Sequence, residues 1–281
     1  MSSGTLRLRA PAKLNLFLHI VGRRPDGYHE LQTVFQLLDF CDELSFSLTD
    51  EQDIRLDGSV PGVPDADNLV MRAAHALATR CSPRSGVRIA LHKRIPHGGG
   101  LGGGSSDAAA TLLALNRLWE CGLSLRELAL IGVELGADVP LFVHGHSAWA
   151  EGIGERLHPL TLPRRWYLVI RPGCAVNTGT IFADRELTRD TPLTTIAAFL
   201  AGGHRNDCEA VVRKRHPEVD RALKWLDTFG EARMSGTGSC VFAAFADAQT
   251  AGETAALVPS GWESFVARGI DRSPVHVALF D

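Results

Sequence analysis

A run of glycines followed by two serines is the first feature of the chain that could do chemistry. Six of the seven residues from Gly98 to Gly104 are glycine, and Ser105, Ser106 and Asp107 follow. Glycine loses more backbone entropy on folding than other residues, so such a run is typical of a main chain that approaches a ligand closely. Successive N–H groups and a helix N-terminus would bind an anion such as a polyphosphate. A flexible linker is the alternative, but the run lies between an alternating strand and an Ala/Leu helix.

Two known phosphate-binding patterns fit this run poorly. Gly98, Gly100 and Gly103 have the spacing of the dinucleotide fingerprint, but Glu120, at about the offset of the ribose-binding acid, follows a helix instead of a strand. In the P-loop pattern, Gly104 stands where the phosphate-binding lysine belongs. The signatures of eukaryotic-type protein kinases are missing as well. The poor match to the dinucleotide fingerprint disfavours a nicotinamide-dependent oxidoreductase.

A carboxylate and an ammonium group elsewhere in the chain could activate an alcohol toward a bound phosphate. Asp138 lies in the segment Gly136 to Pro140, and a carboxylate can accept the proton of an alcohol whose oxygen attacks phosphorus. The ammonium of Lys13 would hold that carboxylate ionised and stabilise charge on the transferred group. Two plainer interpretations stay open, with Asp138 as a helix N-cap and Lys13 as an exposed strand residue.

Two further segments could recognise a substrate. Tyr28 and His29 follow a Pro-Asp-Gly turn, and an aromatic face beside an imidazole suits the stacking and edge recognition of a pyrimidine. Gly236, Thr237 and Gly238 lie in a second glycine turn, whose amides could bind a diphosphate. An ordinary exposed loop and a tight turn before a strand explain these segments without a function.

The elements that must position these residues form a mixed pattern. Alternation over Leu6 to Val21 predicts a strand that places Lys13 beside Asn15. Strands without strict strand–helix–strand alternation favour an α+β architecture over a doubly wound sheet. Further strands are predicted at Asp42 to Leu48, Ile54 to Leu56, Val87 to Ile95, Trp166 to Ile170 and Cys240 to Phe245, and helices from the cap Asn68 to Arg80, from Ser106 to Trp119, from the capping box at Ser124 to Gly136 and from Pro217 to Phe229.

Length and composition limit the classes of protein. The chain has 281 residues, 45% of them hydrophobic and 22% charged, which predicts a folded globular protein of about two domains. A domain boundary is expected between Gly152 and Pro172, where Gly, Pro and Arg are dense. The net charge of −3 gives no general attraction to nucleic acid or anionic lipid. No membrane-spanning or signal-peptide pattern is evident, so a cytoplasmic protein is expected.

The six cysteines show no metal-binding or disulfide pattern. They are scattered, with no C-x-x-C pair and no histidine at zinc-finger spacing. We therefore expect reduced packing residues at Cys41, Cys81, Cys121, Cys174, Cys208 and Cys240.

Three motifs in order resemble the GHMP kinases, the superfamily of galactokinase, homoserine kinase and mevalonate kinase. They are Pro11 to Leu16, Pro96 to Asp107 and Ser235 to Cys240. Within that superfamily, Pro11 to Leu18, Arg24 to His29, Gly98 to Asp107 and Gly136 to Pro140 are similar to the branch that phosphorylates the 2-hydroxyl of a cytidine diphosphate derivative of methylerythritol. The resemblance spans nearly the whole chain.

The resemblance implies a fold and an activity. The fold is α+β, a two-domain GHMP kinase fold with a ribosomal protein S5 domain 2-like N-terminal domain and a ferredoxin-like C-terminal domain. Residues 1–160 would form the ATP-binding domain and residues 161–281 the C-terminal domain, with the active site in the cleft between them. The activity is an ATP-dependent phosphorylation in the non-mevalonate route to isoprenoid precursors.

The resemblance also assigns roles to residues. The catalytic residues would be Lys13 and Asp138. The ATP-binding residues would be Pro96, His97, Gly98, Gly99, Gly100, Leu101, Gly102, Gly103, Gly104, Ser105 and Ser106, with Asn68 and Lys93, for which a helix cap and a solvated strand charge are alternatives. The substrate-binding residues would be Asn15, Tyr28, His29, Phe182, Gly236, Thr237 and Gly238. His97 departs from the pattern, which has an apolar residue, commonly Met, at this place.

The expected cofactors and partners follow from these roles. ATP would bring Mg²⁺, which Ser105 or Ser106 could reach, although no carboxylate ligand and no protein metal site are evident. The partner would be a small molecule, with no nucleic acid or membrane, and the protein a monomer or weak homodimer. Three alternatives stay open. They are another GHMP kinase such as homoserine or mevalonate kinase, a nucleic-acid-binding module and a nicotinamide oxidoreductase.

Overall fold

The computed structural model describes residues 4–58 and 63–281, and mixes strands with helices. The strands are β1 (Leu6–Arg23), β2 (His29–Thr49), β3 (Ile54–Asp57), β4 (Gly86–His92), β5 (Ala148–Gly152), β6 (Arg156–Pro159), β7 (Trp166–Arg171), β8 (Arg233–Met234), β9 (Val241–Phe245) and β10 (Glu263–Ile270). The helices are η1 (Asp65–Asp67), α1 (Leu69–Cys81), α2 (Gly103–Leu118), α3 (Leu125–Leu135), α4 (Val139–His144), α5 (Thr178–Phe182), α6 (Ile196–Ala201), α7 (Glu209–Arg215), α8 (Pro217–Leu226), α9 (Ala248–Ala255) and α10 (Pro274–Phe280).

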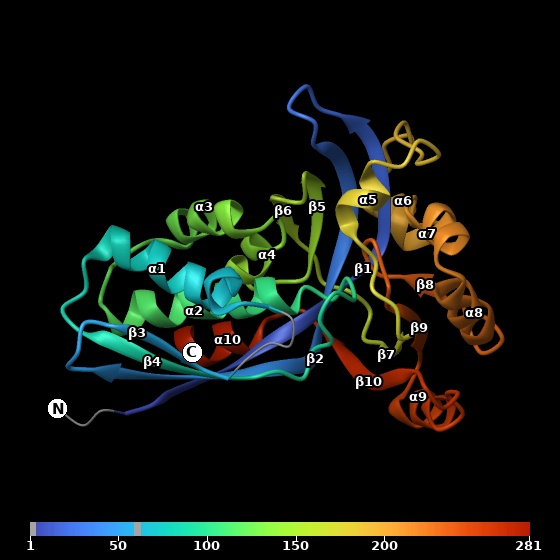
Figure 1. Cartoon of the computed structure of the whole chain (residues 1–281). Coiled ribbons are helices and arrows are strands. Elements are labelled where there is room, and N and C mark those ends of the chain that lie inside the picture. The colour runs from blue at the N-terminus through green and yellow to red at the C-terminus, as the bar shows by residue number, and fades with distance from the viewer. Residues whose placement is uncertain (1–3, 59–62) are drawn as a thin grey trace.

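One sheet runs through the described part of the molecule, and the long strand β2 joins its parts (Figure 1). The order is β3-β4-β2-β10-β7-β9-β8, while β1 and β5 also pair with β2. In the β1–β2 ladder Lys13 lies opposite Leu37 and Asn15 opposite Phe35, with register irregularities on either side of this stretch. Such irregularities bend a strand and redirect its side chains. The predicted strand at residues 6–21 is confirmed, with Lys13 and Asn15 both buried.

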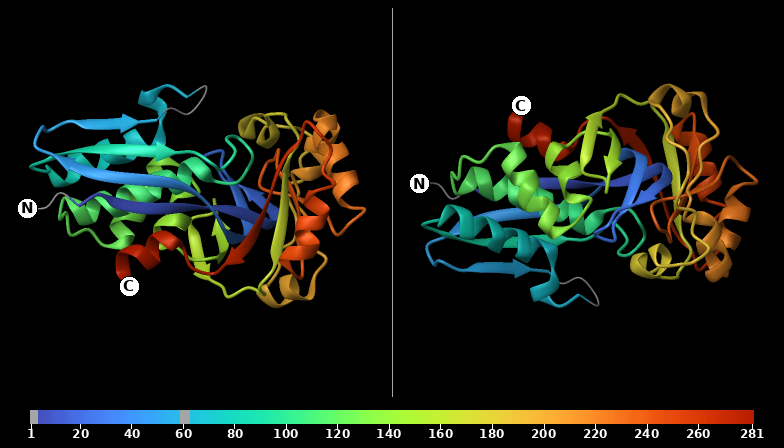
Figure 2. Two further views of the ribbon diagram at one scale, coloured as in Figure 1. Left: turned by 90° about the horizontal axis from the view of Figure 1, so that it is seen from below. Right: turned by 90° about the horizontal axis from the view of Figure 1, so that it is seen from above.

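Helices α1, α2 and α3 cover one face of the part of the sheet that contains β2, β3 and β4 (Figure 1). Their apolar side chains form a core with the strands, and buried examples are Leu77, Ile89, Leu112 and Ile131. The core also contains Val275 and Leu279 of α10. Figure 2 shows this C-terminal helix beside the N-terminal half of the chain. The last residues therefore complete the first core.

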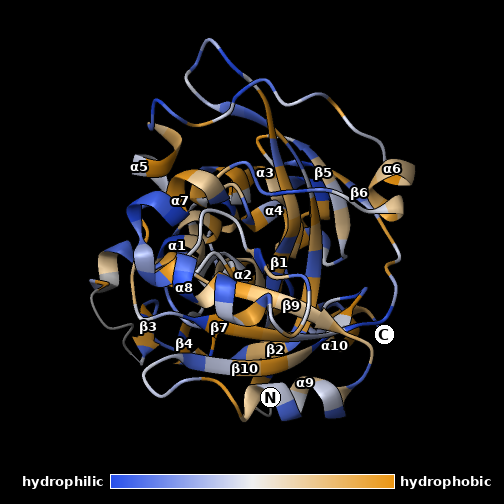
Figure 3. Ribbon diagram, turned by 90° about the vertical axis from the view of Figure 1, so that its right-hand side faces the viewer, coloured by the Kyte–Doolittle hydropathy of each residue, from blue (hydrophilic) through white to orange (hydrophobic). Residues whose placement is uncertain are grey.

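A second core lies between strands β7 and β9 and helices α7 and α8. Leu168, Val241 and Leu223 are among its fully or nearly fully buried members. In Figure 3 the two strands are coloured hydrophobic, while α7 and α8 carry polar residues outward. Strand β10 connects the two parts, since it pairs with β7 over most of its length and with β2 at Gly269 and Ile270. The domain boundary predicted near residue 160 stays a prediction. Helix α10 follows that boundary in the sequence, although its side chains pack in the first core.

Local signals for two helices are confirmed atom by atom. Asn68 caps α1, with its Oδ1 accepting from the Val70 N–H at 3.0 Å. Ser124 and Glu127 form the predicted capping box of α3, and the helix ends before Gly136. Both motifs depend on side chains within three residues of the helix start, so the sequence alone defines them.

Helix α2 starts three residues earlier than the sequence predicts. The helix begins at Gly103 instead of Ser106, so the last two glycines of the run are helical. The reason is packing. A Cβ at Gly103 would lie 2.9 Å from the Ile95 side chain, so a larger residue would separate the helix from the strand end. The tertiary contact outweighs the low helix propensity of glycine.

The prediction of six reduced cysteines is wrong for two of them. Cys81 and Cys121 form a disulfide, with their Cα atoms 5.3 Å apart. Cys81 ends α1, and Cys121 follows α2. These two helices pack against each other, and the contact brings together residues that are 40 positions apart. Cys41, Cys174, Cys208 and Cys240 are free, and all but Cys174 are buried.

Across the described ranges, no helix combines the length and the hydropathy needed to cross a membrane.

Candidate active site

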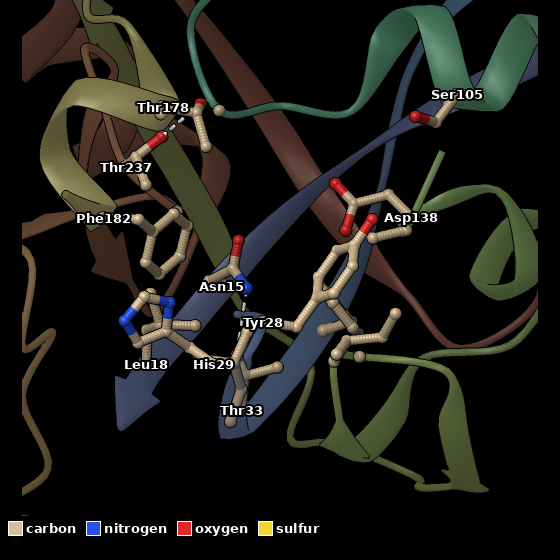
Figure 4. A pocket seen from close by; sticks show the side chains of 18 of the residues that line it. Asn15, Leu18, Tyr28, His29, Thr33, Ser105, Asp138, Thr178, Phe182 and Thr237 are labelled. Carbon is tan, nitrogen blue, oxygen red and sulfur yellow. Dashed lines mark hydrogen bonds between the residues drawn. The ribbon is translucent and has the colours of Figure 1, made fainter. Parts of the chain in front are cut away.

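A cavity of about 680 Å³ brings together most of the residues predicted to bind substrate or act in catalysis. It is lined by the β1–β2 hairpin, α5, the start of α4 and both glycine turns. Figure 4 shows His29 and Phe182 toward one side of it, and Asp138 with Ser105 toward the other. The predicted residues on its wall are Lys13, Asn15, Tyr28, His29, Gly100, Ser105, Asp138, Phe182, Gly236 and Thr237.

Lys13 and Asp138 meet at the cavity wall. The Lys13 Nζ lies 3.2 Å from Asp138 Oδ2, and the lysine side chain is 4% exposed while the aspartate side chain is 31% exposed. The ammonium also lies 5.3 Å from the centre of the Phe35 ring, within cation–π range. The exposed-lysine interpretation is therefore wrong. The carboxylate of Asp138 is therefore partly exposed at the cavity wall, while the ammonium of Lys13 that pairs with it is buried.

Asn15 holds the ammonium in place. Lys13 Nζ donates to Asn15 Oδ1 at 2.6 Å, and Asn15 Nδ2 donates to Thr33 Oγ1 at 3.0 Å. Since an ammonium has only donors, the amide oxygen must face Lys13, and the amide nitrogen must then face Thr33. The Thr33 hydroxyl donates in turn to the carbonyl of Phe17. The orientation of each group is fixed by its neighbour.

Asp138 occupies the N-cap position of α4 without capping it. Its side chain makes no cap hydrogen bond, and its backbone is helical, with φ −85° and ψ −12°. A capping residue normally has an extended backbone and accepts from the first turn. The N-cap alternative is therefore wrong, and the carboxylate is available to Lys13 and to the cavity.

The two glycine turns touch each other, which changes the explanation of part of the glycine run. At Gly100, with φ +76°, a Cβ would lie 2.2 Å from the carbonyl oxygen of Ser235, and at Gly99 it would lie 2.4 Å from Cys240 Sγ. Ser235 Oγ also donates to the Gly100 carbonyl at 2.9 Å. Contact with the second turn is by itself enough to require glycine at both positions. At Gly98, in contrast, no atom lies within 4 Å of the Cβ position.

The N-terminus of α2 retains the features of an anion site. Gly102 occupies the N-cap with φ +70°, and no side chain caps the helix. Its first-turn N–H groups and the positive end of the helix dipole are therefore available to a phosphate. Ser106 Oγ is buried there and has no hydrogen-bond partner within the described chain. Leu101 is buried instead of facing a ligand, and its carbonyl accepts from the Lys13 N–H at 2.9 Å.

Asn68 lies beside this helix start. Leu69, the first residue of α1, approaches the Cβ position of Gly104 to 3.5 Å, so α1 and α2 begin side by side. The Asn68 oxygen is used as the cap, while its Nδ2 is buried and unpartnered in the part of the chain that is described. An unused buried donor is costly unless a ligand accepts from it.

Lys93 lies between two buried carboxylates instead of being a solvated strand charge. Its Nζ donates to Asp42, and to Asp107 Oδ2 at 2.7 Å. Burial raises the pKa of Asp107 to about 7, against the lowering effect of Lys93. Burial would lower the pKa of Lys93, but the two carboxylates raise it. Lys93, which directly follows β4, thereby joins Asp42 of β2 to Asp107 in the second turn of α2. Contact of Lys93 with a nucleotide stays a prediction.

Aromatic side chains form the far end of the cavity. The rings of His29 and Phe182 stack with centroids 5.0 Å apart and planes at 24°. Tyr28 lines the same cavity and is 59% exposed. Burial, followed by the charges of Arg189 and Arg23, lowers the pKa of His29. The neutral form of the His29 imidazole is therefore favoured where it stacks on Phe182.

The second glycine turn closes another side. Thr237 Oγ1 and Thr178 Oγ1 are hydrogen-bonded at 2.8 Å, and Asn206 Nδ2 donates to the Gly236 carbonyl at 2.7 Å. Gly238 does not line the cavity. The other predicted residues away from its wall are Asn68, Lys93, Pro96, His97, Gly98, Gly99, Leu101, Gly102, Gly103, Gly104 and Ser106.

The sequence reasoning missed several residues that build this site. Thr33 and Ser235 orient Asn15, since the Asn15 N–H donates to Ser235 Oγ at 3.2 Å, and Arg189 contacts His29. The turn containing Ser235 carries a signal in the sequence, because Gly236 and Gly238 follow the serine. Arg189 carried none, since it is one of many arginines and lies 160 residues from its partner.

Comparison with known proteins assigns this chain to a family. Residues 68–146 match the GHMP kinases N terminal domain, and residues 185–262 match the GHMP kinases C terminal domain. The 4-diphosphocytidyl-2-C-methyl-D-erythritol kinase of Marinobacter nauticus is 57% identical, covering 98% of this chain and 97% of that protein. The kinase of the same name from Hahella chejuensis is 53% identical, with the same coverage of 98% and 97%.

A crystal structure agrees with the sequence comparisons. That of a 4-(cytidine 5′-diphospho)-2C-methyl-D-erythritol kinase superposes with a TM-score of 0.84 at 34% identity, covering 94% of this chain and 99% of that one. The predicted GHMP kinase fold is confirmed, and the similarity to curated kinases contradicts the oxidoreductase alternative. The chain therefore belongs to the GHMP kinases and, within them, to the family of the 4-diphosphocytidyl-2-C-methyl-D-erythritol kinases.

Proposed function

We propose that the protein transfers the γ-phosphoryl group of ATP to the 2-hydroxyl of 4-diphosphocytidyl-2-C-methyl-D-erythritol, a step of the non-mevalonate route to isoprenoid precursors. The names of its relatives support this substrate. The observation that carries the chemistry is the Lys13–Asp138 pair, 3.2 Å apart, on the wall of a cavity that also contains a stacking group for a base.

In the proposed mechanism Asp138 is the general base. Its carboxylate accepts the proton of the 2-hydroxyl while the oxygen forms a bond to the γ-phosphorus and the bond from that phosphorus to the β-phosphate oxygen breaks, so that ADP leaves. Lys13 stabilises the negative charge on the transferred group. Asn15 directs the ammonium toward Asp138, since its Oδ1 accepts one of the three N–H bonds. The charged pair is set before the substrates bind, which is the arrangement that lowers a barrier most.

The start of α2 is the proposed binding site for the phosphates of ATP. Its uncapped first turn and the loop from Pro96 to Ser106 offer backbone donors, and Asn68 Nδ2 offers an unused side-chain donor. The unpartnered hydroxyl of Ser106, with Ser105 beside it, fits a ligand of Mg²⁺. No cluster of three metal-binding side chains occurs in the described residues, so the phosphate oxygens would supply the other ligands. Bound Mg²⁺ would neutralise phosphate charge.

The aromatic end of the cavity is the proposed site of the cytidine. Tyr28 and Phe182 offer flat faces for stacking, and His29 offers a polar ring edge. The second turn lines the same cavity through Gly236 and Thr237, with the Cβ position of Gly236 3.3 Å from Asn15 Oδ1, and would bind the diphosphate through its amides. The methylerythritol hydroxyl then reaches Asp138, because base, diphosphate and alcohol follow one another along the substrate.

A product assay tests the proposal. Purified protein is incubated with 4-diphosphocytidyl-2-C-methyl-D-erythritol, ATP and Mg²⁺, and mass spectrometry and ³¹P NMR locate the added phosphate. We expect one phosphate on the 2-hydroxyl and an equal amount of ADP. Parallel reactions contain mevalonate or homoserine as the acceptor. Turnover of one of these, without turnover of the cytidine compound, would show that the proposed substrate is wrong.

A further inference from the structure

We propose that Arg189 is a positioning residue that fixes which ring nitrogen of His29 carries the proton, and thereby makes the cavity select cytosine over uracil. This inference rests on the proposed function, because it concerns the end of the cavity assigned to the pyrimidine. Arg189 itself does not line that cavity. It acts through His29.

The guanidinium of Arg189 is held on three sides. Nη1 donates to the Leu187 carbonyl at 3.0 Å, and Nη2 donates to the carbonyls of Phe182 at 2.9 Å and Asp184 at 2.6 Å. The remaining direction of the fork is occupied by His29, whose Nε2 lies 3.1 Å from Arg189 Nε. The three carbonyls belong to the end of α5 and the turn after it, so the fork is rigid where it meets the imidazole.

Elementary hydrogen-bond chemistry then determines the form of His29. Arginine has five donors, has no acceptor and stays protonated in proteins. A hydrogen bond from Arg189 Nε therefore requires a lone pair on His29 Nε2, which leaves the proton on Nδ1. A doubly protonated imidazole would oppose two N–H groups at this contact. Burial and the charges of Arg189 and Arg23, which lower the pKa of His29, favour the same neutral form.

The protonated nitrogen is the one left for a ligand. His29 lines the cavity, its Nε2 is occupied by a residue outside the cavity wall, and Nδ1 has no hydrogen-bond partner among residues 4–58 and 63–281. In Figure 4 the ring lies against Phe182 with one nitrogen toward the side of Asn15 and Tyr28. The protein thus presents a single N–H donor beside a stacking face.

A lone donor that faces ring nitrogen N3, as we propose here, distinguishes the two common pyrimidines. Ring nitrogen N3 of cytosine is an acceptor and can bind the Nδ1–H of His29, whereas N3 of uracil carries a hydrogen and would oppose it. Sites built around one hydrogen bond reject the analogue that leaves the buried group unpaired. With the proton on Nε2 instead, Nδ1 would be an acceptor and the preference would weaken or reverse.

The first experiment measures the tautomer without any substrate. ¹⁵N-labelled protein is studied by long-range ¹H–¹⁵N NMR, whose shifts separate a protonated from an unprotonated imidazole nitrogen. We expect His29 with the proton on Nδ1 in the unchanged protein and in Arg189→Lys, which keeps a cationic donor. We expect Nε2 protonation, or a mixture, in Arg189→Met. Arg185→Met is the matched control, since Arg185 is an exposed arginine four residues earlier. An Nε2 proton in the unchanged protein overturns the inference, even if Arg189→Met does not fold.

The second experiment measures selection. Cytidine 5′-diphosphate and uridine 5′-diphosphate compete with the substrate, and the ratio of their inhibition constants is compared between variants. We expect Arg189→Met to lower the preference for cytidine about tenfold, the size of one hydrogen bond to a buried group. In a His29→Ala background the same change should have no further effect on the ratio, because Arg189 acts through His29.

The outcomes separate this inference from the proposed function. A loss of preference that persists in the His29→Ala background would show that Arg189 only supports the loop that contains Phe182, and an unchanged ratio in Arg189→Met would show no role in selection. Either result overturns the inference. If the unchanged protein phosphorylates no cytidine diphosphate alcohol in the product assay, the proposed function fails instead, while the tautomer measurement keeps its meaning.

Discussion

At the residue scale, the catalytic proposal depends on a lysine that the sequence places in a strand and the fold removes from water. Lys13 is 3% exposed, and its ammonium meets the carboxylate of Asp138, the amide oxygen of Asn15 and the face of Phe35. These contacts offset the cost of removing a charge from water. In the proposed mechanism the charge is thus available to the transferred phosphoryl group without a rearrangement.

Replacement of either member of the pair should abolish most turnover and leave a folded protein. In Lys13→Met the developing charge loses its partner, and in Asp138→Asn the base is lost, so we expect the kcat to fall by about 10²-fold or more. Turnover is measured with ATP and the cytidine substrate, and folding by circular dichroism. Lys224→Met, a change to an exposed lysine on α8, is the control and should leave kcat unchanged. Near-normal kcat in either variant would contradict its assigned role.

The state of His29 predicts a pH dependence of binding. Burial first, then Arg189 and Arg23, lowers the pKa of His29 below its usual 6.5. The unfolded chain therefore binds more protons than the folded one below about pH 6.5, so the contribution of this group to stability decreases as pH falls. Protonation also places a second N–H against Arg189. We expect the affinity for cytidine 5′-diphosphate, measured by calorimetry, to fall on acidification more steeply than in His29→Ala, and parallel curves would contradict this.

At the element scale, the glycine run serves two purposes that the sequence does not distinguish. Its middle, Gly99 and Gly100, lies against the second glycine turn, whereas its end begins α2. Two hydrogen bonds join the two turns: Ser235 Oγ donates to the Gly100 carbonyl, and the Cys240 N–H donates to the Gly99 carbonyl. A third bond, from the Ser235 N–H to the Cys240 carbonyl, closes the second turn on itself. The loop proposed to bind the phosphates of ATP is thereby held by the same turn that is proposed to bind the substrate diphosphate.

A pair of alanine variants separates backbone strain from steric contact in this loop. Gly98 and Gly100 have φ angles of +73° and +76°, so alanine is strained at both by about 1–2 kcal/mol. Only at Gly100 would the new Cβ meet a backbone atom, 2.2 Å away. We expect Gly100→Ala to unfold at lower denaturant and to raise the KM for ATP more than Gly98→Ala does. Equal effects of the two changes would contradict the contact between the turns.

At the scale of the whole molecule, the end of the chain returns to the beginning. Strand β10 pairs with β7 and then with β2, and α10 packs its Val275 and Leu279 into the first core. Arg117 of α2 donates to the Leu279 carbonyl at 2.7 Å, which ties the two helices together. The helix at which we propose the phosphate site is therefore supported by the last residues of the sequence.

Two valines on α10 test this support with one chemical change. Val275 is 2% exposed and Val277 is 48% exposed. We expect Val275→Ala to lower the free energy of unfolding by about 2 kcal/mol, while Val277→Ala stays within about 0.5 kcal/mol of the unchanged protein. Urea titrations measure both. Hydrogen exchange should accelerate in α2 and not in α8 of Val275→Ala, and faster exchange confined to α8 would show that α10 belongs to the second core.

What the sequence determined by itself is local or repeated along the chain. The caps at Asn68 and Ser124, the alternation that makes β1, and the glycine run before α2 depend on side chains a few residues apart, so they are visible without the fold. The similarity of several motifs in order to one kinase family supplied the function class. Those motifs also identified the wall of the cavity at Lys13, Asp138 and His29.

Only the tertiary structure decided which of these residues touch. Four contacts join segments that are distant in sequence. They are the Lys13–Asp138 ion pair, the Cys81–Cys121 disulfide, the burial of Lys93 between two carboxylates and the hydrogen bond from Arg189 to His29. Spacing does not encode such pairs, because sheet pairing and helix packing bring them together only when the whole chain has folded. The same packing is enough to explain the glycines at positions 99 and 100.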